Sequence, residues 1–159
     1  RHWNQSRFPC DFLIMKIVLQ RVSHSRVKVN GETVGEINRG ILLLLGVHKD
    51  DTTEKADFLA SKVADLRIFP DQEGKMNLSL KEIGGEALVV SQFTLLGECS
   101  KGRRPSFIDA ASPEKGNSLY MYFVEQLKKQ VTKVETGRFG AMMEVELVND
   151  GPVTLILER

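Results

Sequence analysis

Residues 87–96, which read A-L-V-V-S-Q-F-T-L-L, constrain the fold of this chain more than any other segment. The β-branched and aromatic residues of this run are typical of a strand, and the apolar residues at both ends predict that the strand is buried. Between them, Ser91-Gln92-Phe93-Thr94 carries polar side chains, which need hydrogen-bond partners if they are buried. The pattern has two interpretations: a hydrogen-bonded structural network, which is the more common case, or one wall of a pocket.

Further strands are predicted from short alternating or apolar runs. Asn30-Gly31 favours a two-residue hairpin, and the apolar run 41–47 has the length of a central strand, not of a buried helix. Asn149-Asp150-Gly151-Pro152 predicts a break between the last two strands. These predicted strands comprise residues 17–22, 26–29, 33–37, 41–47, 143–147 and 153–157.

Two amphipathic helices are predicted between these strands. The first begins at Asp51, with Glu54 at the spacing of a capping box, and ends at Phe69-Pro70-Asp71. The second begins at Ser112-Pro113-Glu114, where a capping serine precedes a proline at the first helical position. The buried faces are Ala56, Leu59, Val63 and Leu66 in the first helix and Leu119, Phe123, Leu127 and Val131 in the second. The order of elements predicts a single α+β domain: a mostly antiparallel, curved or barrel-like β-sheet covered by two α-helices.

The length and charge of the chain are those of one soluble globular domain. Its 159 residues carry a formal net charge of +1, so any contact with RNA or DNA has to come from a local basic patch. Residues 1–14 lack a repeating pattern and precede Met15, so we expect a non-native or disordered extension there and a domain over residues 15–159. No segment approaches the roughly 18 apolar residues of a membrane span. Cys99 is the only cysteine after the extension, which favours a reducing, cytoplasmic location.

The sequence lacks the motifs of several kinds of enzyme site. His24 and His48, the histidines after the extension, have no cysteine or acidic residue at ligand spacing, so we expect no protein-bound metal. There is no P-loop, no G-x-G-x-x-G after a strand and no G-x-S-x-G turn, which argues against nucleotide binding by a phosphate loop and against a serine triad. Both histidines and Cys99 fit a structural or exposed role better than a catalytic one. No cofactor is expected.

Two further segments combine residue types that binding sites use. Residues 101–107, K-G-R-R-P-S-F, place Lys101, Arg103 and Arg104 on a polar loop that ends at an aromatic residue. Such a loop is most often solvated surface, and its cations are also suited to binding phosphate. Residues 149–154, N-D-G-P-V-T, contain a Gly-Pro pair that is usually only a turn, although a cis bond there would mark a deliberate feature.

These motifs together resemble the D-aminoacyl-tRNA deacylase family of the D-tyrosyl-tRNA deacylase type. The resemblance covers nearly all of residues 15–159, beginning with M-K-I-V-L-Q-R-V and continuing with L-R-I-F and G-K-M-N-L-S-L. Ser25, where alanine is common, and Gly97-Glu98, where Ala-Asp is more usual, depart from the family pattern outside its specific motifs. Those motifs are S-Q-F-T-L at 91–95, K-G-R-R-P-S-F at 101–107, T-G-x-F-G-A-x-M at 136–143 and N-D-G-P-V-T at 149–154.

The resemblance implies a cytoplasmic homodimer that acts as a proofreading esterase on tRNA. Its substrate is the ester between a D-amino acid, or glycine, and the terminal adenosine of tRNA. The reactive side of the site is expected at the 91–94 segment, the adenosine is expected to pack against Phe139 and Met143, and neither DNA nor a membrane is expected as a partner. The catalytic candidates of the 91–94 segment are Ser91, Gln92, Phe93 and Thr94.

The resemblance also implies a contribution from the partner subunit. Gly151 and Pro152 of one subunit, joined by a cis bond, are expected to enter the active site of the other and to reject L-amino acids. An L side chain would be driven against their carbonyl groups, whereas glycine has no side chain to collide. Lys101, Arg103 and Arg104 are candidates for contacts with tRNA phosphates.

The absence of an obvious base leaves two mechanisms open. An activated ester loses its leaving group more readily than an amide does. Positioning of the substrate and an oxyanion site formed by the backbone N–H groups of Phe93 and Thr94 can therefore supply much of the rate acceleration. We favour hydrolysis in which the ribose 2′-hydroxyl of the substrate activates water, with Thr94 as a covalent nucleophile as the rival mechanism. Two functions of other classes also stay open: an RNA-end binding module without catalysis and a general small-ester hydrolase.

Overall fold

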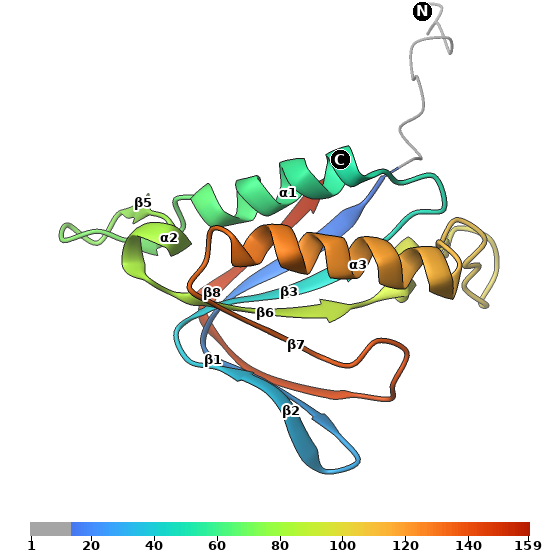
Figure 1. The fold of residues 1–159 in the computed structure, drawn as a ribbon, viewed down its shortest axis with the longest axis horizontal. Coiled ribbons are helices and arrows are strands. Elements are labelled where there is room, and N and C mark those ends of the chain that lie inside the picture. The colour runs from blue at the N-terminus through green and yellow to red at the C-terminus, as the bar shows by residue number, and fades with distance from the viewer. Residues whose placement is uncertain (1–13) are drawn as a thin grey trace, which may run out of the picture.

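The structure, a computed structural model, describes residues 14–159 as a curved sheet with helices across one face (Figure 1). Apart from Ile14, the expected extension 1–14 lies outside the described residues. The sheet has the order β2-β1-β3-β6-β7, β8 pairs with β1, and β4 and β5 form a separate small hairpin. The strands are β1 (Lys16–Val29), β2 (Glu32–Ile37), β3 (Gly40–Gly46), β4 (Phe69–Pro70), β5 (Met76–Leu78), β6 (Glu86–Ser91), β7 (Lys133–Thr136) and β8 (Glu144–Glu158).

β1 organises the sheet because it pairs with β2, β3 and β8. Its first half runs antiparallel to β3, its second half runs antiparallel to β2, and β8 runs antiparallel beside both halves. This division of one strand between two partners curves the sheet (Figure 1). At Gly35 of β2 the sheet nearly closes, because a Cβ there would lie 2.3 Å from the carbonyl oxygen of Thr136 in β7. The predicted α+β class and barrel-like sheet are confirmed.

Two parallel pairings make the sheet mixed. β3 pairs parallel with β6, and β6 pairs parallel with β7. The chain makes these crossovers through α1 (Thr53–Asp65) and α3 (Pro113–Lys128), which pack against each other over one face of the sheet (Figure 1). The main core lies beneath these helices, and a second cluster lies inside the curve of the sheet: Val22, Val27, Ile37, Leu42, Leu88 and Val90.

The helix starts follow the sequence in one case and depart from it in the other. Ser112 caps α3 as predicted, since its Oγ accepts a hydrogen bond of 3.3 Å from the Lys115 N–H. The predicted cap at Asp51 is wrong, because α1 begins at Thr53. The buried Asp51 carboxylate instead accepts hydrogen bonds from the His48 N–H (2.6 Å) and the Lys55 Nζ (3.2 Å), so it closes the preceding turn. A short third helix, α2 (Leu80–Ile83), has a capping box.

The prediction of one buried strand over residues 87–96 is wrong in its second half. β6 ends at Ser91, and the chain continues as a 3₁₀ helix, η2 (Phe93–Leu96), with Phe93 exposed. Gly46 permits this close packing of η2 on the end of β3, because a Cβ there would lie 2.5 Å from Leu96 Cδ2. Gln92 and Thr94 therefore lie beyond the end of β6, and their side chains need no hydrogen-bond partners within the sheet.

The predicted break at 149–152 interrupts the pairing but not the strand. β8 runs without interruption from Glu144 to Glu158. Gln20 pairs with Thr154 and Val22 pairs with Asn149, so residues 150–153 of β8 bulge opposite a single residue of β1, Arg21. We call residues 149–153 the Gly-Pro bulge. Sequence patterns also did not predict β7, a four-residue strand after α3.

Candidate active site

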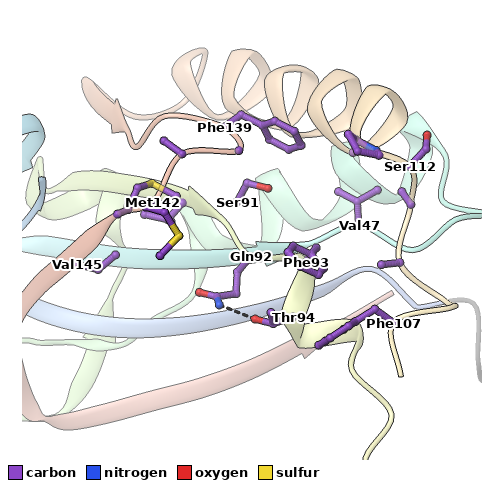
Figure 2. Close-up of a pocket in the computed structure, with 18 residues that line it drawn as sticks. Val47, Ser91, Gln92, Phe93, Thr94, Phe107, Ser112, Phe139, Met142 and Val145 are labelled. Atoms are coloured by element: carbon purple, nitrogen blue, oxygen red, sulfur yellow. Dashed lines mark hydrogen bonds between the residues drawn. The ribbon is translucent and has the colours of Figure 1, made fainter. Parts of the chain in front are cut away.

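A cavity of about 600 Å³ opens where the C-terminal ends of the parallel strands β3 and β6 meet the start of α3 (Figure 2). Its volume lies within the range of small-molecule sites, roughly 300–1,000 Å³. The carboxyl ends of parallel strands are also where sheets with crossover helices most often bind ligands. Three segments that are distant in the sequence supply most of the wall: the 91–94 segment, residues 107–116 and residues 139–145.

The 91–94 segment forms one side of this cavity. Ser91 is paired with Leu45 of β3, and the Gln92 N–H donates to the Leu45 carbonyl at 2.8 Å. The Gln92 Nε2 donates to Thr94 Oγ1 at 2.6 Å, a bond visible in Figure 2. The first amides of a helix have no partner within it, and in η2 the first amide that bonds back along the chain belongs to Leu95, which donates to the Gln92 carbonyl at 3.2 Å. The Phe93 and Thr94 amides are therefore free of helical partners at the wall of the cavity.

The opposite side of the cavity is apolar and built on α3. Phe139 lies across from Ser91 (Figure 2), and its ring packs 6.1 Å from that of Tyr120. Met143 is drawn back against its own loop, because the Arg138 N–H contacts its sulfur at 3.4 Å and Gly137 leaves room for it; a Cβ at Gly137 would lie 2.7 Å from that sulfur. The predicted adenosine residues, Phe139 and Met143, therefore face the predicted reactive segment across one cavity.

The cavity wall contains no ionisable side chain. All 18 lining residues belong to the described range 14–159, and none is Asp, Glu, His, Cys, Tyr, Lys or Arg. Tyr120 lies behind Phe139, where its hydroxyl donates to the Val89 carbonyl at 2.8 Å and burial raises its pKa to about 12. The polar groups available to a ligand are therefore the hydroxyls of Ser91, Thr94 and Ser112, the Gln92 amide and the backbone.

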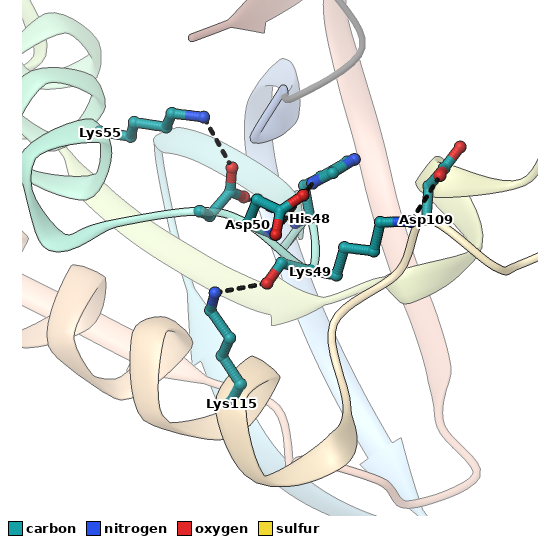
Figure 3. A network of polar contacts seen from close by, with 7 residues as sticks. His48, Lys49, Asp50, Lys55, Asp109 and Lys115 are labelled. Atoms are coloured by element: carbon teal, nitrogen blue, oxygen red, sulfur yellow. Dashed lines mark hydrogen bonds and ion pairs between the residues drawn. The ribbon is translucent and has the colours of Figure 1, made fainter.

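A polar network holds the 107–112 side of the cavity in place (Figure 3). The Ala111 N–H donates to the Val47 carbonyl at 2.9 Å, and the Lys49 N–H donates to the Asp109 carbonyl at 2.9 Å. The Lys49 Nζ also lies 3.5 Å from the Asp109 carboxylate, and Lys115 at the start of α3 donates to the Lys49 carbonyl. These contacts tie one wall of the cavity to the end of β3.

His48 belongs to the same turn and has a structural role. Its side chain is buried, and its Nδ1 accepts a hydrogen bond of 3.0 Å from the Asp50 N–H. Nearby, burial raises the pKa of the Asp51 carboxyl, while the hydrogen bond from the His48 N–H acts in the opposite direction. Neither side chain lines the cavity. Within residues 14–159, no group of three or more His, Cys, Asp or Glu side chains is arranged as metal ligands are.

The Gly-Pro bulge lies outside the cavity of its own chain. The Gly151-Pro152 bond is cis, as the family resemblance implied, and both residues are exposed. Neither of them lines the cavity. This segment is therefore not brought together with the 91–94 segment within one chain.

Arg21 of β1 fixes the Gly-Pro bulge. Its Nε lies 3.2 Å from the Asp150 carboxylate and donates to the Asp150 carbonyl, while its Nη1 donates to the Ile68 carbonyl at 2.6 Å. The other side of the bulge is closed by Asn149, whose Nδ2 donates to Thr154 Oγ1 at 2.9 Å and whose Oδ1 accepts from the Val153 N–H at 3.2 Å. Asp150 and Thr154, for which no role was predicted from the sequence, therefore hold the bulge.

The basic loop, residues 97–106, projects beside the cavity without entering it. Its two ends are bridged by reciprocal hydrogen bonds between Glu98 and Ser106 of 2.7 and 2.9 Å. Lys101, Arg103 and Arg104 are exposed on this loop, and they do not line the cavity.

Part of the cavity wall was not identified from the sequence. Phe107, Ala110 and Ala111 line it, together with Ser112, which was interpreted only as a helix cap. The sequence held one usable signal for this wall, the aromatic residue at the end of the basic loop. Short alanine-containing connections carry no recognisable pattern.

Comparisons with known proteins converge on one family. The family model described as D-Tyr-tRNA(Tyr) deacylase matches residues 18–158. A D-aminoacyl-tRNA deacylase of Geotalea uraniireducens (strain Rf4) is 62% identical over 144 residues, which are 91% of this chain and 93% of that protein. A D-aminoacyl-tRNA deacylase of Desulfatibacillum aliphaticivorans is 60% identical over 144 residues, which are 91% of this chain and 99% of that protein.

Solved structures show the same fold. A structure named c-Myc DNA Unwinding Element Binding Protein has a TM-score of 0.85 and 41% sequence identity, and the match covers 90% of this chain and 97% of that one. A probable eukaryotic D-amino acid tRNA deacylase has a TM-score of 0.80, with coverage of 92% of this chain and 100% of that one. The identity in the second case is 20%, so this likeness concerns the fold alone.

Proposed function

Because the chain belongs to the D-Tyr-tRNA(Tyr) deacylase family, we propose that it hydrolyses the ester bond of D-aminoacyl-tRNA and of mischarged glycyl-tRNA, releasing the free amino acid and the tRNA. The observation that carries the mechanism is the cavity wall, which combines free backbone amides with an absence of ionisable side chains among the described residues. A site of this kind stabilises charge and positions reactants but contributes no side-chain base.

The reaction begins when water adds to the ester carbonyl carbon. The negative charge that develops on the carbonyl oxygen is stabilised by the Phe93 and Thr94 N–H groups, and removal of one such donor typically costs about 100- to 1,000-fold in rate. The 2′-hydroxyl of the terminal ribose accepts the proton of the attacking water and passes a proton to the departing ribose oxygen. The carbon–oxygen bond to the ribose then breaks, so that all atoms and charges are balanced without a protein base.

Thr94 acts in this mechanism as a positioning group and not as a nucleophile. A nucleophilic threonine needs a neighbouring base to take its proton. The partner of its hydroxyl is the Gln92 side-chain amide at 2.6 Å, and an amide is no base in either orientation. The hydrogen bond from Gln92 to Thr94 instead helps to fix the start of η2 beside the substrate.

The terminal adenosine occupies the apolar side of the cavity. Phe139 offers a ring face for the base, and Met143 packs beside it with a polarisable sulfur. This placement directs the ester toward the 91–94 segment. The cations of the basic loop, Lys101, Arg103 and Arg104, contact phosphates of the tRNA outside the cavity.

Chiral selection requires a homodimer in which the Gly-Pro bulge of one subunit enters the cavity of the other. The support for this is that the bulge is exposed, rigidly held and remote from its own cavity. Val148, Leu155 and Ile156 expose apolar side chains on β8 around the bulge, a surface that a second copy would cover. The bulge rejects L side chains by collision, whereas glycine passes. We infer a cytoplasmic location from this substrate, because tRNA is charged in the cytoplasm.

One assay separates this function from its alternatives. The protein is incubated with matched D- and L-aminoacyl-tRNA and with a free D-amino acid ester, and released amino acid is measured. Hydrolysis of only the D-aminoacyl-tRNA supports the proposal. Binding of the tRNA without turnover would instead show an RNA-end binding module, and cleavage of the free ester would show a general small-ester hydrolase.

A further inference from the structure

The rim of the cavity carries two exposed aromatic rings that the proposed reaction does not use. The side chains of Phe93 and Phe107 are 56% and 38% exposed. Their ring centroids lie 5.2 Å apart with an angle of 70° between the planes, an edge-to-face pair (Figure 2). Such a pair covers one face of only one ring. Open ring faces therefore remain at the mouth of the cavity.

Phe107 is held firmly in this position. The hydrogen bonds between Glu98 and Ser106 fix the residue before it, and its own carbonyl accepts from the Ala110 N–H at 3.1 Å. The ring packs against Gly97, where a Cβ would come within 2.9 Å of Phe107 Cε1. An aromatic ring fixed by its surroundings loses little conformational entropy when a ligand stacks on it.

The ring directly follows an exposed cationic segment. Lys101, Arg103 and Arg104 precede Phe107 within six residues. The acid of this loop, Glu98, is turned to the backbone, where its carboxylate accepts from the Ser100 N–H at 2.7 Å. Exposed rings beside a cationic segment are the combination with which proteins bind single-stranded nucleic acid, because bases stack on the rings and the backbone phosphates meet the cations.

We propose that Phe107 is the stacking platform for the base of the nucleotide that precedes the terminal adenosine of the substrate. The inference rests on the proposed function, since it takes the adenosine to lie in the cavity and extends the same RNA strand across its rim. Phe93 packs against Phe107 in the edge-to-face pair, and the basic loop follows the phosphates. A base inside a double helix is stacked between its neighbours and offers no free face, so the platform selects an unpaired 3′ end.

The test compares a substrate that reaches the platform with one that does not. A D-amino acid esterified to a C-C-A trinucleotide extends over the rim, whereas the same amino acid esterified to adenosine alone ends inside the cavity. Phe107→Leu keeps an apolar side chain but removes the ring face, and Phe107→Tyr keeps the face. Phe58, 41% exposed on α1, supplies the matched control Phe58→Leu.

We expect Phe107→Leu to lower kcat/KM for the trinucleotide ester about 5- to 150-fold more than for the adenosine ester, the range that corresponds to one stacked base. Phe107→Tyr keeps the preference of the unmodified protein for the trinucleotide ester, and Phe58→Leu does not change that preference. Equal losses on both substrates, or no loss on either, would overturn the inference, because the ring would then serve only the cavity wall or nothing at all.

Failure of the proposed function is distinguishable from failure of this inference. If the unmodified protein cleaves neither ester, the platform is tested by fluorescence anisotropy with the unacylated C-C-A trinucleotide, and the deacylase proposal fails only if D-aminoacyl-tRNA is not cleaved either. A Kd raised at least about 5-fold by Phe107→Leu and restored by Phe107→Tyr supports the platform. An unchanged Kd, or a change in oligomeric state in place of a change in Kd, overturns it.

Discussion

The 91–94 segment and the Gly-Pro bulge both interrupt an apolar strand with polar residues, and the structure uses them in opposite ways. The first leaves its sheet, becomes a 3₁₀ helix and lines the cavity of its own chain. The second stays within β8, bulges opposite Arg21 and lies outside that cavity. In the proposed mechanism this difference separates two tasks: bond cleavage uses backbone amides inside the subunit, and selection against L-amino acids uses the Gly-Pro bulge of the partner subunit.

The strongest test of the first region removes one backbone amide. Phe93→Pro eliminates the N–H at the start of η2, where a proline fits because its fixed φ matches a 3₁₀ helix. Phe93→Ala is the matched control, because it loses the ring and keeps the amide. We expect kcat of the proline variant to fall about 100- to 1,000-fold below that of the alanine variant. Equal kcat values, with thermal unfolding confirming the fold of both, would show that this amide does not stabilise the oxyanion.

The second region is tested through Arg21, whose charged hydrogen bonds hold Asp150. Such bonds contribute about 1.5–3 kcal/mol each, so we expect Arg21→Ala to loosen the bulge and to lower the ratio of D- to L-aminoacyl-tRNA hydrolysis by about 10-fold or more. Arg26→Ala breaks an ion pair with Glu146 between the same two strands, at 2.5 Å, and should leave this ratio as it is. If both variants change the ratio alike, the bulge is not the selective element.

Thr94 sharpens the contrast between backbone and side-chain chemistry. We expect Thr94→Ala to keep deacylation within about 10-fold of the unmodified protein, because the amide of residue 94 remains and only the contact with Gln92 is lost. The measurement is single-turnover hydrolysis of D-aminoacyl-tRNA. Near-complete loss in Thr94→Ala with activity kept in Thr94→Ser would establish the covalent mechanism instead.

The sequence predicted the elements of this fold better than it predicted their ends. The hairpin at Asn30-Gly31, the cap at Ser112 and the two amphipathic helices follow from local chemistry and are confirmed. The end of β6 at Ser91 depends on the packing of η2 against Gly46, which lies far earlier in the chain, and no local sequence pattern predicts such a contact. The mixed sheet likewise depends on crossovers that composition does not reveal.

The candidate site shows the same limit. The 91–94 segment, Phe139 and Met143 were expected together from the family resemblance, and they share one cavity. The wall at residues 107–112 was not expected, because its position comes from backbone hydrogen bonds to Val47 and Lys49. The bulge was expected as a break, since Gly-Pro disrupts pairing, but its restraint by Arg21 is a tertiary contact.

The basic loop offers a smaller effect that depends on salt. Replacing Lys101, Arg103 and Arg104 with Gln removes three cations, so the slope of log affinity for tRNA against log salt should become shallower by up to about 2, at roughly 0.7 per lost contact with a single strand. The control replaces Lys128, Lys129 and Lys133, near the far end of α3, with the same change of charge. Equal slopes in the two triple variants would assign the basic loop to solvated surface.

The smallest expected effect concerns the ion pair between Arg26 and Glu146. Hydrogen bonding to Arg26, with its positive charge and that of Lys28 in addition, lowers the pKa of the Glu146 carboxyl to about 2. In the unfolded chain a glutamate titrates near 4.3, so the contribution of this pair to folding is present above roughly that pH and is lost as the pH falls through about 2.

A carboxyl NMR titration should show Glu146 ionised at pH 3 and, in Arg26→Ala, a pKa displaced upward toward that of an ordinary glutamate. Both groups are exposed, so the accompanying change in unfolding free energy is small and is screened by salt. A Glu146 pKa that is insensitive to Arg26→Ala would mean that the ion pair does not persist in solution. Arg26→Ala would then no longer be a valid control for Arg21→Ala, because it would break no contact between β1 and β8.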